Sequence, residues 1–332
     1  MGFETQDVER KVISILKVLS DSQTPLGSRI IARRLKDLGV ELGERAVRYH
    51  LKLMDERGLT QLIGRRDGRV LTERGVEEVG SALVKDKVGF AISRIALLAF
   101  RTDFDLDKRT GSVPINISIF PKERFNKALQ IMKPAFVSGL CVSDLVAVAQ
   151  EGDMLGELVI PPGKVGLATV CSVVINGTLL KLGVPIDSKF SGILQIRNFK
   201  PLRFVELINY SGCSLDPSEV FIRAKMASVL KAAREGAGKI LATYREIPAS
   251  CQPIVEKTVE KLKEAGLGGL LVMGGNSESV CEIPVELNRI GIILVNGLNP
   301  VAAAVESGIE VGNHGMSSVI EYKNLVNFHE LI

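Results

Sequence analysis

The sequence has 332 residues, 46% of them hydrophobic, which is enough for two or three domains with sizeable cores. Its 42 basic and 38 acidic residues give a net charge of +4, too small to identify a nucleic-acid partner by itself. The five cysteines are scattered without a C-x-x-C pair and the three histidines are far apart, which argues against a disulfide framework or a zinc site and leaves no metal or cofactor to expect.

Three helices are predicted at the start of the chain. Apolar residues at helical spacing predict a helix over 5–20. A second, shorter helix buries Ile31, Leu35 and Leu38. A third helix begins near Gly43, because glycine is tolerated as an N-cap.

A hairpin and a fourth helix follow. Asp67-Gly68 is a strong two-residue hairpin signal, because both central positions of that turn need a positive φ. Thr72 then caps a helix that runs to about Val84. This order predicts a winged helix-turn-helix domain over residues 1–86. Three arginines lie on or beside the tip of its wing: Arg65, Arg66 and Arg69.

The third helix is expected to read DNA. If Val47, Leu51 and Met54 face the core, helical geometry turns five polar residues outward: Glu44, Arg45, Arg48, Tyr49 and Lys52. Between Arg29 and Arg69 there are eleven Lys or Arg and six Asp or Glu, the local excess that phosphate contacts need. The alternative is a solvated basic helix, or a winged helix that contacts protein.

The rest of the chain predicts an α/β or α+β regulatory domain over 113–332, after a connector at 87–112. Candidate strands are 113–120, 144–149, 156–160, 164–171, 192–196, 238–245, 269–274, 282–285, 290–295 and 317–321. Candidate helices are 122–137, 176–183, 217–234, 252–265 and 299–307. No apolar run is long enough to span a membrane, and a cytoplasmic protein is the default expectation.

This domain is interpreted as an internal duplication. Sliding it by 125 residues aligns VGLATV at 165–170 with IGIILV at 290–295, and INISI with ILATY. Residue identity along the slide is near chance, but apolar runs, glycines and helices agree. The expected halves are 113–196 and 238–321, each β-α-β-β-β-α-β, joined by residues 197–237.

Two features of this domain are candidate ligand sites. A buried strand runs into Cys171-Ser172 and then Asn176 at a helix start, where free backbone N–H groups attract anions. The alternative is an ordinary strand-to-helix junction with a structural cysteine. Glycine turns at 268–269 and 274–275 lack a nucleotide-binding signature. No catalytic motif is present, so we expect no enzyme.

With these residues in view, the chain resembles the archaeal nitrogen-regulatory repressors of the NrpR family. The likeness is carried by AVRYHLKLMDERGLT and GRRDGRVLTERG in the head. In the body it is carried by GKVGLATVCSVVINGTLLKLGVPIDSKFSGILQI, KPLRFVELI, SLDPSEVF, ATYREIPA and GLNPVAAAVESGIEV. The resemblance implies a transcriptional repressor of nitrogen-assimilation genes that releases its operator on sensing 2-oxoglutarate.

The family's single-protein form has two regulatory domains after its head, whereas residues after 86 have room for one. The resemblance therefore implies the split form, in which a second protein supplies another regulatory domain. A homodimer on double-stranded operator DNA is expected, because one winged helix makes too few contacts alone.

A site for 2-oxoglutarate needs cations and oriented N–H donors. The expected effector residues are Cys171, Ser172 and Asn176, with Arg203 of the KPLRF motif as the cation. The alternatives left open are a metabolic enzyme tethered to a DNA-binding head, and a body that only dimerises.

Overall fold

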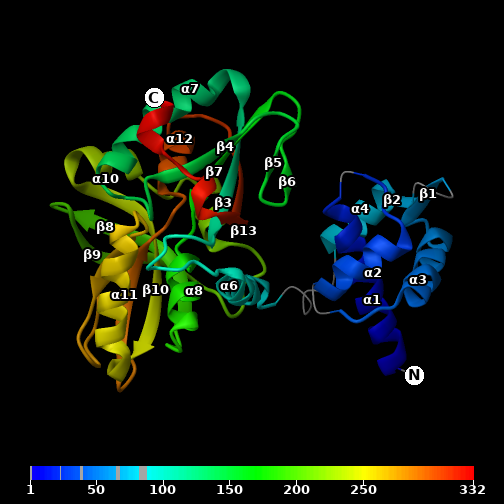
Figure 1. The fold of residues 1–332 in the computed structure, drawn as a ribbon, viewed down its shortest axis with the longest axis horizontal. Helices are drawn as coiled ribbons and strands as arrows, with labels where there is room; N and C mark the ends of the chain where they lie inside the picture. Colours follow the sequence, from blue (N-terminus) through cyan, green and yellow to red (C-terminus); the bar gives the residue numbers. More distant parts are fainter. Residues whose placement is uncertain (1, 23, 38–39, 65–67, 82–87) are drawn as a thin grey trace. The chain divides into compact units, whose positions relative to one another are not determined.

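A computed structural model describes residues 2–22, 24–37, 40–64, 68–81 and 88–332 (Figure 1). Contacts divide the chain into two compact units between Val88 and Gly89, so the expected connector at 87–112 belongs largely to the second unit. The two units are called the head and the body, and each is described by itself.

The head is a winged helix-turn-helix, as predicted. Its elements are α1 (Gly2–Ser20), α2 (Ser28–Asp37), α3 (Glu44–Glu56), β1 (Thr60–Gly64), β2 (Gly68–Leu71) and α4 (Glu73–Ser81). Gly43 is the N-cap of α3, and the Thr72 hydroxyl accepts a hydrogen bond from the backbone N–H of Gly75 at 3.0 Å. The apolar faces of α1, α2 and α3 form one core, which includes Ile31 and Leu51. Leu38, Asp67 and the predicted end of α4 near Val84 lie outside the described residues.

The body begins with α6 (Phe90–Arg101) and continues with alternating strands and helices. Its strands are β3 (Ser112–Pro121), β4 (Leu145–Ala149), β5 (Met154–Leu155), β6 (Leu158–Val159), β7 (Lys164–Val170), β8 (Asp187–Arg197), β9 (Lys200–Asn209), β10 (Ala237–Pro248), β11 (Leu270–Met273), β12 (Arg289–Val295), β13 (Gly312–Glu321) and β14 (Val326–Asn327). Its other helices are α7 (Lys122–Val137), α8 (Val173–Lys181), α9 (Pro217–Arg223), α10 (Val229–Glu235), α11 (Gln252–Glu264) and α12 (Asn299–Glu306). Short 3-10 turns lie at Ala249–Cys251, Tyr322–Asn324 and Phe328–Leu331.

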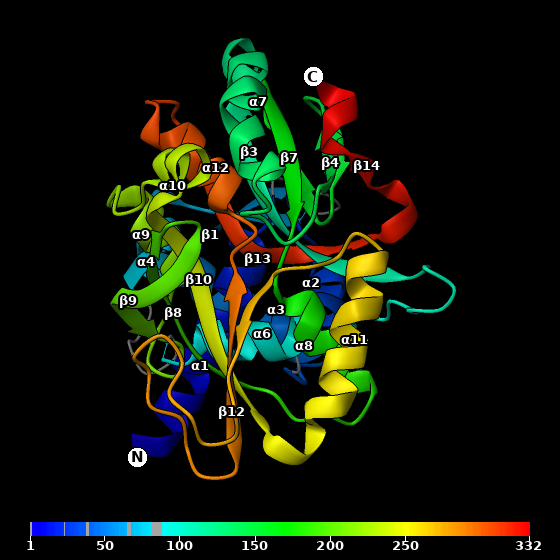
Figure 2. The same ribbon diagram turned by 90° about the vertical axis from the view of Figure 1, so that its left-hand side faces the viewer.

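Two five-stranded antiparallel sheets form the centre of the body. One has the order β13-β3-β7-β4-β14 and the other the order β11-β12-β10-β8-β9. Helices α7, α10 and α12 contact one another at one end of the body, and α8 packs with α11 and α6 at the other end (Figure 2). A single apolar core runs through both sheets.

The expected duplication is visible in the topology. The second half, from β10 to β13, runs β-α-β-β-α-β. The first half, from β3 to β8, has the same order with the small β5–β6 hairpin added between β4 and β7, so neither half has the expected order β-α-β-β-β-α-β. The halves exchange their last strands, because β8 pairs with β10 of the second half and β13 pairs with β3 of the first half. Each sheet therefore contains a strand from the other half of the chain.

The register shows that the slide by 125 residues needs a correction within the first strands. Pro121 pairs with Lys164 in the first half, and Pro248 pairs with Arg289 in the second half. Lys164 and Arg289 are 125 residues apart, as the slide requires. Their partners Pro121 and Pro248 therefore correspond to each other, although they are 127 residues apart, so β3 and β10 align with an offset two residues larger than the rest. Strands β3 and β10 end at these prolines, directly before the next helix or 3-10 turn. By the same register Asn116 corresponds to Thr243.

Some predicted elements differ from the observed ones. The strand expected at 156–160 is the small β5–β6 hairpin, and 282–285 contains only an isolated bridge between Val280 and Ile283. The helix expected at 217–234 is two helices, α9 and α10, with Lys225 between them at a positive φ of 53°. The expected link 197–237 contains the edge strand β9. Its residues are largely exposed, so they lack the alternation of apolar and polar residues that marks a half-buried strand in a sequence.

Candidate functional site

Helix α3 presents a polar face as its spacing predicts. Val47, Leu51 and Met54 are buried, and the outward positions that are exposed are Arg45, Arg48, Tyr49 and Lys52. Tyr49 keeps 66% of its surface exposed, which is uncommon for an aromatic residue in a packed domain. Helix α2 adds exposed basic residues: Arg29, Arg33, Arg34 and Lys36. The head thus carries a concentrated basic surface of the kind that binds phosphates.

Acidic residues on α3 hold some of these cations. The Arg48 guanidinium donates a hydrogen bond to the Glu44 carboxylate one turn away, and it lowers the pKa of that carboxyl. Lys52 lies 4.0 Å from Glu56, also one turn away. Both pairs are exposed and therefore weak, so phosphate oxygens can replace the acids at small cost.

The wing arginines divide into two groups. Arg69 pairs with Asp55 at the end of α3, with its Nε 2.8 Å from Oδ2 and 3.1 Å from Oδ1. Its side chain is only 21% exposed, so it fixes the wing to α3 instead of pointing freely into solvent. Arg65 and Arg66 lie outside the described residues.

A small polar cavity lies in the body where the two halves meet. Its walls come from α6 and both sheets, with lining residues Ile95, Asn116, Cys171, Ser172, Val173, Tyr210, Asp216, Ser218, Thr243, Arg245, Asn296 and Met316. Two corresponding pairs of the duplication line it, Asn116 with Thr243 and Cys171 with Asn296. The space within the cavity that the centre of a water molecule can occupy is about 10 Å³, so the cavity has room for about one water.

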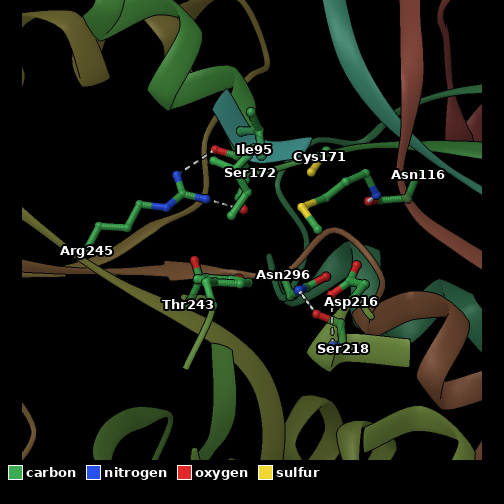
Figure 3. A pocket seen from close by; sticks show the side chains of 12 residues that line it. Ile95, Asn116, Cys171, Ser172, Asp216, Ser218, Thr243, Arg245 and Asn296 are labelled. Atoms are coloured by element: carbon green, nitrogen blue, oxygen red, sulfur yellow. Dashed lines mark hydrogen bonds between the residues drawn. The ribbon is translucent and has the colours of Figure 1, made fainter. Parts of the chain in front are cut away.

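Arg245 is the cation of this cavity (Figure 3). It lies on β10 with 1% of its surface exposed, and donates from Nη1 to the carbonyl and from Nη2 to the hydroxyl of Ser172, both at 3.0 Å. Its Nε finds no partner among the described residues, and neither does the nearby Thr243 hydroxyl. Burial lowers its pKa, but an arginine stays protonated in proteins. A buried guanidinium without a carboxylate is costly, which favours an anionic ligand here.

The structure brings together two of the expected effector residues. Cys171 and Ser172 both line the cavity at the start of α8. Burial raises the pKa of the Cys171 thiol to about 11, so this cysteine lines the cavity as an uncharged thiol and not as a nucleophilic thiolate. Asn176 is buried one turn further along α8, where its Nδ2 donates to the Ser188 hydroxyl at 3.1 Å, and it does not line the cavity.

Arg203 lies elsewhere. It is on the edge strand β9 with half of its side chain exposed, 3.9 Å from Glu282, and it is not among the cavity residues. Arg245, and not Arg203, is therefore the arginine that lines this cavity. The sequence held a signal for this, because an arginine in the middle of the apolar strand ILATYREIP is rarely buried without a purpose.

Asp216 is the second charged group of the cavity. It is the N-cap of α9, and its Oδ1 accepts a hydrogen bond from the Ser218 backbone N–H at 2.9 Å. The Ser218 hydroxyl in turn accepts a hydrogen bond from Asn296 at 2.6 Å (Figure 3). Burial raises the pKa of Asp216 to about 6, more than its bonds to Ser218 lower it.

Helix α6 closes one side of the cavity. Ile95 lines it directly, and Ala91, Leu98 and Ala99 belong to a small apolar cluster with cavity residues such as Met316. The Arg94 guanidinium donates to the backbone carbonyl of Met316 at 2.6 Å and to that of Ser317 at 3.2 Å. This helix is also the first element of the body after the head in the chain.

The described residues contain no cluster of three His, Cys, Asp or Glu side chains placed to hold a metal ion. Within the same residues, no helix is both long enough and apolar enough to cross a membrane.

Comparison with known proteins gives family matches to both units. A family model described as NrpR regulatory domains NRD1 and 2 matches residues 88–327, and one described as the Ribonuclease R winged-helix domain matches residues 13–79. A crystal structure of a nitrogen repressor-like protein from Methanococcus jannaschii aligns with a TM-score of 0.62 at 26% identity, covering 73% of this chain and 99% of the other.

Three relatives are similar over most of this chain. The global nitrogen regulator NrpRI of Methanosarcina mazei is 41% identical over 318 residues, which cover 96% of this chain and 98% of that protein. The global nitrogen regulators NrpR of Methanococcus maripaludis and Methanocaldococcus jannaschii are 31% and 33% identical, over 89% and 96% of this chain. The matches cover 51% and 55% of those two relatives, so the chain spans about half their length.

These relatives are named as regulators and not as enzymes, and the head has the fold of a DNA-binding domain. The tethered-enzyme alternative is thereby set aside in favour of a nitrogen transcriptional regulator. The matched regulatory-domain model covers more than half of the chain, and the Methanosarcina relative is similar along nearly its whole length. The chain belongs to the NrpR family.

Proposed function

We propose that this chain is a repressor of nitrogen-assimilation genes whose binding to operator DNA is relieved by 2-oxoglutarate. The observation that carries the proposal is the cavity around Arg245, a wholly buried cation without a carboxylate partner among the described residues. A regulator of nitrogen assimilation needs a metabolic signal, and a buried guanidinium is suited to a carboxylate.

The operator side of the proposal rests on the head. Arg45, Arg48, Tyr49 and Lys52 are exposed on the helix that enters the major groove in winged-helix proteins. Residues in the first half of such a helix reach base edges, and the others hold phosphates. We propose binding as a homodimer to a palindrome with half-sites about 10–21 bp apart between centres. A monomer on DNA without a palindrome would contradict this.

The effector side rests on unsatisfied polar groups. The Arg245 Nε and the Thr243 hydroxyl have no hydrogen-bond partner in the described part of the chain, although both are buried. An unpaired buried polar group costs about 1–3 kcal/mol, so a ligand that pairs with the guanidinium and with the hydroxyl gains about that amount for each of the two groups. A carboxylate accepts from the guanidinium, and an oxygen of the ligand accepts from the hydroxyl.

The small cavity volume suggests how binding acts on the head. A dicarboxylate is several times larger than the one water for which the cavity has room, so the cavity must open before the effector enters. Helix α6 is a wall of the cavity and is the first helix of the body after the head in the chain. We propose that the effector displaces α6 and thereby alters the placement of the heads. Operator and effector then favour different positions of α6, which is the condition for coupling between the two sites.

The proposal is tested by retention of operator DNA with and without 2-oxoglutarate. Arg245→Met should keep DNA binding and lose the response to the effector, because truncating one partner of a buried charged contact costs about 2–5 kcal/mol of affinity. Arg203→Ala is the matched control, an exposed arginine in the same sheet, and should respond like the wild type. Wild-type release of operator by the Arg245 variant would place the effector site elsewhere.

A further inference from the structure

The cavity combines two charged groups that do not form an ion pair with each other. Arg245 directs its guanidinium at Ser172, whereas Asp216 lies with Ser218 and Asn296 on another side (Figure 3). Among the described residues, the Asp216 carboxyl accepts a hydrogen bond from the backbone N–H of Ser218, a neutral donor. The other oxygen, Oδ2, lies over Gly315, where a Cβ would collide with it.

Charged groups surround Asp216 without neutralising it. The titratable or charged groups that act on it or line the cavity with it are Cys171 after β7, Tyr210 after β9, Glu219 on α9, Arg245 on β10 and Arg94 on α6. On β13, His314 directly precedes Gly315, over which the carboxyl lies. Burial raises the pKa of both Cys171 and Tyr210, so these two are neutral near pH 7. Arg94 is occupied by two backbone carbonyls.

The charge balance of the cavity decides which ligand it accepts. With Asp216 ionised, the cavity has one positive and one negative group, the pattern that suits an α-amino acid with its carboxylate and its ammonium. With Asp216 protonated, the cavity keeps only the positive charge and gains an O–H donor, which suits a 2-oxo dicarboxylate. Two carboxylates close together in a site of low dielectric do not both stay ionised.

We propose that Asp216 is a specificity-determining residue that takes up a proton from solvent when a 2-oxo dicarboxylate binds and donates it in a hydrogen bond to a ligand oxygen. This inference rests on the proposed function, because it names the charge state in which that effector site accepts 2-oxoglutarate. The same site with Asp216 ionised favours the corresponding amino acid, L-glutamate. The protonation state of Asp216 therefore determines whether the site prefers 2-oxoglutarate or L-glutamate.

The proposal makes binding of 2-oxoglutarate depend on pH. Free Asp216 has a pKa of about 6, and protonation on binding means that the pKa in the complex is higher. Affinity is then full about one pH unit below 6 and falls as pH rises, by roughly eightfold from pH 6.5 to 7.5. The carboxylates of 2-oxoglutarate are ionised throughout this range, so the change reports the protein.

The experiment is calorimetry of 2-oxoglutarate binding to the full chain, in buffers of different ionisation enthalpy at each pH. At pH 7.5 the wild type should take up close to one proton for each ligand bound. Asp216→Asn stays neutral at every pH and keeps an N-cap acceptor for Ser218. It should bind without proton uptake, with affinity independent of pH and roughly thirtyfold tighter than the wild type at pH 7.5. Binding of L-glutamate should weaken in the same variant.

Glu219→Gln is the matched control, since Glu219 is a neighbouring carboxyl whose pKa burial also raises. It should keep the proton uptake of the wild type. Uptake that persists in Asp216→Asn, or that disappears in Glu219→Gln alone, overturns the assignment to Asp216. Binding by the wild type without proton uptake overturns this inference and leaves the proposed function standing. No binding of 2-oxoglutarate by the wild type overturns the proposed function, and this inference with it.

Discussion

The head and the body use positive charge in opposite ways. In the head, Arg48 and Lys52 are exposed, and each lies beside an acidic residue of its own helix. In the body, Arg245 is buried and has no carboxylate partner among the described residues. Exposed cations interact through water, so each adds little to the binding energy, and salt screens its interaction with an anion. A buried charge acts in a medium of low dielectric, so it is selective and its loss is severe. The first arrangement suits a long polyanion, and the second suits one small ligand.

The largest effect on stability is expected at the carboxyl of Asp216, in the absence of ligand. The pKa of Asp216 is raised from 3.8 to about 6, so the folded protein holds this proton more tightly than the unfolded chain. The stability that follows is fully present below about pH 4 and is lost as pH rises through 6. At pH 7.5 Asp216→Asn should therefore be more stable than the wild type by up to about 3 kcal/mol.

Urea-induced unfolding at several pH values between 4.5 and 7.5 measures this difference. The stabilisation by Asp216→Asn should shrink as the pH falls. A difference that stays constant across these pH values would show that the pKa of Asp216 is the same in the folded and unfolded chain. The charges of the body would then not differ from those of the head in this respect.

The next effect concerns Arg48. If its guanidinium contacts a base edge, Arg48→Ala should cost about 1–3 kcal/mol of operator affinity and relax the preference at one base pair. The measurement is binding to a set of operators that differ at single positions. Equal losses on all of them would make Arg48 a phosphate contact.

A smaller effect is expected from Lys52, which lies further along α3 and is mostly exposed. Lys52→Ala should weaken binding to every sequence alike and reduce the slope of log affinity against log salt by about one unit. Titrations at several salt concentrations give that slope. If it is unchanged, Lys52 does not contact phosphate.

The smallest effect on DNA binding is expected from Arg69. Because it pairs with Asp55 within the head, Arg69→Ala should lower the stability of the head by about 1 kcal/mol or less. Operator affinity should stay close to that of the wild type when the head is folded. A loss as large as that of Arg48→Ala would show that Arg69 leaves Asp55 to contact DNA.

Sequence periodicity was sufficient for much of the fold. It predicted α7 over the residues that form it, the start of α3 at Gly43, and most strands of both sheets, because these segments are buried on regular faces. It failed where burial is irregular, as in β9, and where a single residue with positive φ interrupts a helical pattern, as at Lys225. Pattern analysis detects repeating burial and misses local exceptions.

The candidate site was harder to predict. Cys171 and Ser172, which line the cavity, could be picked out from the sequence because a strand and a helix meet there, and a helix start is a local feature. Arg245 was missed because its place in the cavity depends on its contact with Ser172, 73 residues away in the other half of the chain. Arg203 was chosen from its motif, but its position on an edge strand leaves it in solvent.

The exchange of strands between the halves has a consequence for synthesis of the protein. The first sheet needs β13, which pairs with β3 over nearly 200 residues of sequence separation, as Ser118 with Asn313 illustrates. A chain emerging from the ribosome therefore cannot complete this sheet until Gly312–Glu321 has been made. Contacts at such separation form slowly, so the body is expected to fold after translation and in one cooperative step. If the chain acts as proposed, a nascent chain with a finished head and an unfinished body would bind DNA before its effector site exists.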